Sequence, residues 1–64
     1  MTELTLSPNL DKVDDFYAEL LDAHAGLSEA DTHALNARLI LILANHIGSK
    51  EVLSQALSAA KAAG

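Results

Sequence analysis

The chain has 64 residues, a net charge of −5 at pH 7 and no cysteine, and half of its residues are hydrophobic. A chain this short forms one domain and buries only about 60% of its unfolded surface, while the missing cysteines exclude disulfides and thiolate metal sites. The four Lys and Arg residues are scattered, whereas a nucleic-acid-binding protein carries a basic patch. We therefore expect no nucleic-acid partner, and a domain that needs either very good helix packing or association.

Residues 1–8 are predicted to form an extended N-terminal tail. Polar and apolar residues alternate there, but one short strand has nothing to pair with in a helical domain. The tail has neither the cationic segment nor the long apolar segment of a secretory signal. The longest apolar run, Leu39 to Ala44, is far shorter than the roughly 20 residues that span a bilayer. These features favour a cytoplasmic protein with no membrane partner.

The first helix is predicted over residues 10–24. Pro8 suits the turn into it, Asn9 is the preferred N-cap with Asp11 as competitor, and Gly26 is expected to end it. Acidic residues fill one face, which is typical of a solvated surface, with docking onto a basic partner as the alternative. The other face carries apolar residues at helical spacing, closed by a histidine: Val13, Phe16, Tyr17, Leu20, Leu21 and His24.

The chain is organised around a long helix predicted over residues 29–47, with Ser28 as N-cap and Gly48 as its stop. At about 100° per residue its apolar side chains cover roughly 200°, about twice what a helix on a single core requires. The helix should therefore be packed on two sides, and a second chain is the natural candidate for part of that arc. The arc contains Leu35, Leu39, Ile40, Ile42, Leu43, Ala44 and Ile47, and Leu41 falls outside it.

Two polar residues interrupt this arc, Asn36 near its middle and His46 on one flank. A buried Asn without a partner costs about 1–3 kcal/mol, so Asn36 is expected to be hydrogen-bonded. A buried Asn can also fix the register or the choice of partner between helices. We expect this structural role for Asn36 rather than a catalytic one.

A third helix is predicted over residues 50–62, capped by Ser49. Its apolar stripe is rich in alanine, which buries little area, so it should dock weakly. The connections on both sides of the central helix are short and favour antiparallel neighbours. The sequence thus predicts a single all-α domain over residues 1–64, built from three helices with short turns and completed by oligomerisation.

No residue pattern indicates catalysis. The three histidines, His24, His33 and His46, form no zinc-binding pattern such as HExxH. No serine lies in a Gly-flanked nucleophile elbow, and the three glycines are isolated, so no phosphate-binding loop is present. We predict no catalytic residue, no metal and no cofactor.

Two runs, NLDKVDDFYAELLDAHAGLS and ALNARLILILANHIG, resemble a family of small uncharacterised bacterial helical proteins classed as a domain of unknown function. The resemblance covers about Asn9 to Leu53. Members of that family resemble accessory open reading frames beside FAD-dependent aromatic hydroxylases and other enzymes of aromatic catabolism. The resemblance implies an accessory or partner role in such a pathway and assigns no catalytic residue.

The leading functional hypothesis is a non-enzymatic interaction module, either a homodimer or an accessory subunit of a bacterial catabolic enzyme such as a flavin-dependent hydroxylase. The alternative is a small-molecule-binding protein or minor enzyme with a polar pocket around His24, Asn36 and His46, and a third possibility is a self-assembling structural protein. The predicted interface consists of Phe16, Tyr17, Leu35, Asn36, Leu39, Ile40, Leu43, His46 and Ile47.

Overall fold

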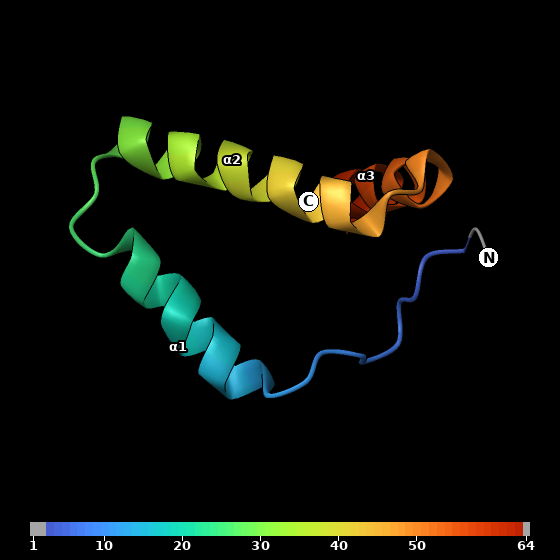
Figure 1. Ribbon diagram of the computed structural model, residues 1–64, viewed down its shortest axis with the longest axis horizontal. Helices are drawn as coiled ribbons and strands as arrows, with labels where there is room; N and C mark the ends of the chain where they lie inside the picture. The colour runs from blue at the N-terminus through green and yellow to red at the C-terminus, as the bar shows by residue number, and fades with distance from the viewer. Residues whose placement is uncertain (1–2, 64) are drawn as a thin grey trace.

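The computed structural model describes residues 3–63, and what the sequence predicts for residues 1, 2 and 64 lies outside them. The described chain confirms the all-α prediction, with three helices and no strand. The helices are α1 (Val13–His24), α2 (Glu29–Ile47) and α3 (Lys50–Ala63). Helix α2 is central, α1 diverges from it as the second arm of an open V, and α3 turns back behind the far end of α2 (Figure 1).

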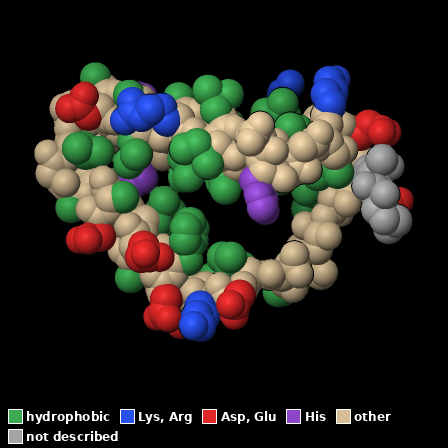
Figure 2. Space-filling view, viewed as in Figure 1, with side chains coloured by type: hydrophobic (Ala, Val, Ile, Leu, Met, Phe, Trp, Pro, Cys, Tyr) green, Lys and Arg blue, Asp and Glu red, His purple; other side chains and the backbone are tan. Residues whose placement is uncertain are grey.

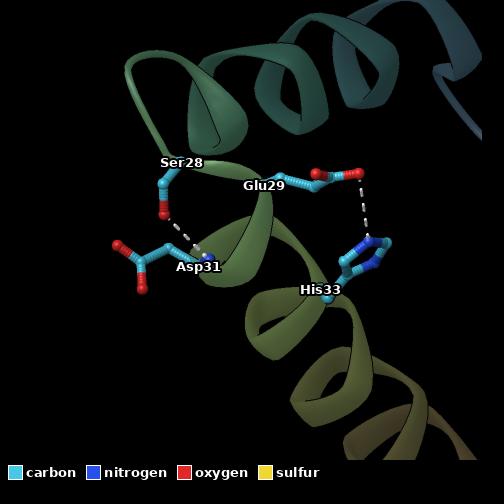
Figure 3. A network of polar contacts seen from close by, with 4 residues as sticks. All are labelled: Ser28, Glu29, Asp31 and His33. Carbon is cyan, nitrogen blue, oxygen red and sulfur yellow. Dashed lines mark hydrogen bonds and ion pairs between the residues drawn. The ribbon is translucent and has the colours of Figure 1, made fainter.

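Helix α2 begins and ends where the sequence predicts. The Ser28 hydroxyl accepts a hydrogen bond of 3.1 Å from the backbone N–H of Asp31, as Figure 3 shows. At the other end Gly48 has φ 77°, and its N–H donates to the carbonyl of Ala44 at 2.9 Å. A left-handed residue at this position turns the chain out of the helix while satisfying one of its last carbonyls.

Helix α1 begins at Val13, three residues later than predicted. Lys12 lies in the left-handed region with φ 50° and ψ 52°, and no side chain caps the helix, so the prediction of an Asn9 or Asp11 cap is wrong. A left-handed residue cannot continue a right-handed helix, so residues 11 and 12 form a turn and Leu10 precedes it outside the helix. The predicted stop is confirmed, since α1 ends at His24 and Gly26 has φ 77°.

Helix α3 begins as predicted and ends one residue later, at Ala63. The Ser49 hydroxyl accepts a 3.2 Å hydrogen bond from the N–H of Val52, which confirms it as the cap. The extended N-terminal segment reaches this helix, because the N–H of Leu4 donates to Oε1 of Gln55 at 2.9 Å. Helix α3 therefore holds both the far end of α2 and the N-terminal tail.

Residues 3–63 form no closed hydrophobic core. Among the described residues no side chain is fully buried, and the chain exposes 5627 Å² of surface. A compact monomer of its mass, 6.7 kDa, would expose about 3,900 Å², so the chain exposes an excess of roughly 1,700 Å². The three helices by themselves do not bury the apolar surface that the sequence provides.

Candidate functional site

A groove opens between the two arms of the V and encloses a cavity of about 310 Å³. We call it the α1–α2 groove. Figure 2 shows apolar side chains around the hollow between the arms. Its walls combine an apolar surface with one acidic and one imidazole group: Phe16, Glu19, Leu20, Ala23 and His24 from α1, and Leu35 and Leu39 from α2.

A second groove, of about 430 Å³, lies between α2 and α3. All the side chains that line this α2–α3 groove are apolar: Ile40, Ala44, Leu53, Ala56, Leu57 and Ala60. Two of them, Ile40 and Leu57, remain 64% and 67% exposed, so the groove is open to a further apolar element.

The side chains in the middle of α2 are exposed on every side of the helix. Residues 40–43 are each between 49% and 70% exposed, and four consecutive residues cover a full turn of the helix. The predicted arc left Leu41 out, yet Leu41 is as uncovered as the residues within the arc. A run of large aliphatic side chains around a whole helical turn is the composition of a helix packed on more than one side.

The residues of the predicted interface fall into two groups. Those half-buried on the inner side of the V are Leu35, Asn36 and Leu39. Those accessible to another molecule are Phe16, Tyr17, Ile40, Leu43, His46 and Ile47.

His24 and Asn36 join α1 to α2. The His24 Nε2 atom lies 2.8 Å from Oδ1 of Asn36, and Nδ1 lies 2.7 Å from the backbone carbonyl of Leu20. A ring that donates from both nitrogens is the imidazolium, so the hydrogen bond to Leu20 raises the pKa of His24 above 6.5, and the bond to Asn36 adds to this. Partial burial acts in the opposite direction. The prediction that Asn36 is hydrogen-bonded is confirmed.

The predicted polar pocket is assembled only in part. His24 and Asn36 meet beside the α1–α2 groove, but His46 is exposed and lies about 15 Å farther along the α2 axis. Both ring nitrogens of His24 already contact protein oxygens. The geometry therefore describes a tether between two helices rather than a set of three convergent polar groups.

Sequence reasoning missed one polar contact, between His33 Nε2 and Glu29 Oε2 at 3.9 Å (Figure 3). Its signal was available, because an acidic residue four positions before a basic one is a favourable helical pair. Both side chains are largely exposed, and such pairs contribute little to stability. Across residues 3–63 no cluster of three or more His, Asp or Glu side chains is arranged to hold a metal ion.

The stability of the fold is expected to fall as the pH rises above about 6.5, the ordinary pKa of histidine. Because the folded-state pKa of His24 is raised, its contribution is fully present below the unfolded value near 6.5 and is lost as the pH rises through the folded value. Urea unfolding at several pH values, with NMR titration of the imidazole, measures both quantities.

Asn36→Ala should lower the pKa of His24 and flatten the pH dependence, because it removes one of the two oxygens that favour the imidazolium. His46→Gln is the matched control, since it removes an exposed histidine and should leave the slope unchanged. An unchanged His24 pKa in Asn36→Ala would mean that the contact does not form in solution.

No helix in the described part of the chain has the length and apolar character needed to cross a membrane. Comparisons with curated proteins and with solved structures returned no match. Residues 4–62 match the family described as a protein of unknown function (DUF2783). The match agrees with the resemblance to a domain of unknown function and extends over nearly all of the sequence, so the chain belongs to the DUF2783 family.

Proposed function

We propose that this chain is a non-enzymatic helical interaction module that acts as a cytoplasmic accessory subunit of a larger bacterial enzyme. The proposal rests on the middle of α2, where the large aliphatic side chains of residues 40–43 are exposed around a full turn of the helix. Exposed apolar surface of this extent marks a site of association, because its burial against another polypeptide is favourable by about 25 cal/mol per Å².

The surface excess of roughly 1,700 Å² gives the scale of that association. Specific interfaces bury about 800 Å² per partner, and obligate ones more. The excess is thus enough for one large interface or for two of standard size. A module of this kind can complete its own core and still present a face to an enzyme.

The proposed class of enzyme rests on the family resemblance. Family members resemble accessory reading frames beside FAD-dependent aromatic hydroxylases, so we propose a flavin-dependent hydroxylase of aromatic catabolism as the partner. The acids of α1, among them Asp15 and Asp22, offer a surface for a basic patch on that partner. Figure 2 shows acidic side chains along the α1 arm.

Affinity capture of the tagged chain from native host extract tests this function. We expect one abundant enzyme in stoichiometric amount, and we expect the purified pair to re-form a complex of defined mass. The tagged Leu43→Asp variant, purified in the same way, is the control. It should be recovered in similar amount but without the enzyme. An eluate that contains this chain alone contradicts the accessory role.

A small-molecule site is the second candidate, supported by the His24–Asn36 contact at the edge of the α1–α2 groove. It is the weaker one, because the ring nitrogens of His24 are engaged with protein oxygens and His46 lies elsewhere. NMR spectra of the His24 imidazole, recorded with and without an added small molecule, discriminate the two candidates. A small-molecule site predicts that the His24 signals shift when the ligand binds, whereas an interaction module needs no such ligand.

A further inference from the structure

Helix α1 carries two apolar rows, and its own chain uses only one of them. Phe16 and Leu20 line the α1–α2 groove. The second row, made of Val13, Tyr17 and Leu21, recurs every four residues and is 54–59% exposed. A helix with an uncovered second row fits between two elements, only one of which this chain supplies.

The α2–α3 groove has the shape and chemistry to receive such a row. Its walls are apolar throughout, and two of its three large side chains, Ile40 and Leu57, are mostly exposed. Helix α1 has 12 residues and a length of about 18 Å, and α3 has 14 residues and a length of about 21 Å. The small alanines of α3 permit close approach of another helix along this length.

The α1 helix of the same chain does not fill this groove. A short turn, residues 25–28, and the His24–Asn36 hydrogen bond hold α1 against the other end of α2. Figure 1 shows α1 diverging from α2 on the side away from α3. A helix with the apolar row of α1 can therefore enter the α2–α3 groove only from another molecule.

The charge distribution favours a second copy of this chain as that molecule. Residues 1–31 hold eight acidic residues and one lysine, a charge of −7, while residues 32–64 hold three basic residues and one acidic residue, a charge of +2. In helical projection Asp14 lies about 20° from Leu21, and Lys50 and Lys61 lie within about 40° of Leu57. The acidic edge of one copy's α1 thus meets the basic edge of the other copy's α3.

We propose that two copies associate about a two-fold axis, with the Val13–Tyr17–Leu21 row of each α1 seated in the α2–α3 groove of the other. This arrangement rests on the proposed function, and it identifies a second copy of the chain as the first partner that covers the exposed apolar surface of the module. A two-fold interface uses the same surfaces twice, so each copy gives one α1 and one groove. Covering about half of the excess of roughly 1,700 Å² on each chain buries roughly 1,700 Å² in total, the size of a standard stable interface, and leaves a similar area for a further partner.

Charge exchange between copies tests the arrangement. Variant one carries Lys50→Glu and Lys61→Glu, and variant two carries Asp14→Lys. Each alone places like charges at both contacts of a dimer and should raise its dissociation constant on the order of a hundredfold at low ionic strength. Mixed in equal amounts they restore opposite charges at both contacts, so native mass spectrometry should show a heterodimer.

Arg38→Glu is the control for these charge changes. Arg38 lies about 160° around α2 from Ile40, so this variant should leave the dimer intact.

The outcomes separate this arrangement from the proposed function. A wild-type dimer that survives in both variants, or a mixture that forms no heterodimer, overturns the arrangement and leaves the interaction module standing. If the wild-type chain is a monomer that folds only together with a captured enzyme, the proposed dimer is overturned and the proposed interaction module is supported. A wild-type monomer that unfolds cooperatively at the same temperature at every concentration, and captures nothing, overturns both.

Discussion

Leu43→Asp is expected to dissociate the assembly. Leu43 is 49% exposed on the side of α2 that also presents Ile40 and Ile47. Burying a leucine contributes about 1.5–3 kcal/mol, and an aspartate in its place must also lose water. Leu43 is already half covered in the monomer and occurs twice in a symmetric dimer, so the lost burial alone costs about 1.5–3 kcal/mol, on the order of ten- to a hundredfold in Kd.

Analytical ultracentrifugation and native mass spectrometry give the mass before and after this substitution. Leu41→Asp is the matched comparison, because it makes the same chemical change at a residue that is 70% exposed and lies about 160° away, on the opposite side of the exposed turn of α2. Both variants lose the same helix propensity, so a difference between them reports the interface. A Leu43→Asp protein of wild-type mass would mean that the interface lies elsewhere on the surface.

Gly48→Val is expected to have the second largest effect, by straining the α2–α3 connection. Gly48 has φ 77°, a conformation that β-branched residues rarely adopt, and the strain costs about 1–3 kcal/mol. The nearest atom to an added Cβ is the carbonyl oxygen of Asn45 at 4.0 Å, so the loss comes from the backbone and not from a clash. In a small domain in which none of the described side chains is buried, this is a large part of the total stability.

Urea unfolding followed by circular dichroism at a fixed protein concentration measures the loss for Gly48→Val. Gly48→Asn is the control, because asparagine tolerates the left-handed conformation and should lose clearly less. Equal stability of the valine variant and the wild type would mean that the connection adopts another conformation in solution.

The surface residues of the candidate site were predictable, and their arrangement was not. Helical periodicity alone identified Phe16, Leu35 and Leu39, and the structure brings these three together in one groove. Periodicity could not show that His24 contacts Asn36 and that His46 lies apart from both. These positions depend on which ends of α1 and α2 meet. The placement of Leu41 outside the arc was reasonable for a single core, but no single core forms.

The sequence by itself determined the three helices, both ends of α2 and the start of α3. Ser28, Gly48 and Ser49 act through hydrogen bonds to residues three or four positions away, so the signal and its effect lie in the same short segment. Only the tertiary structure decided that Lys12 turns left-handed before α1 and that α1 diverges from α2. It also decided that both grooves stay open. Those features depend on packing between residues far apart in the sequence, and here that packing buries no side chain among the described residues.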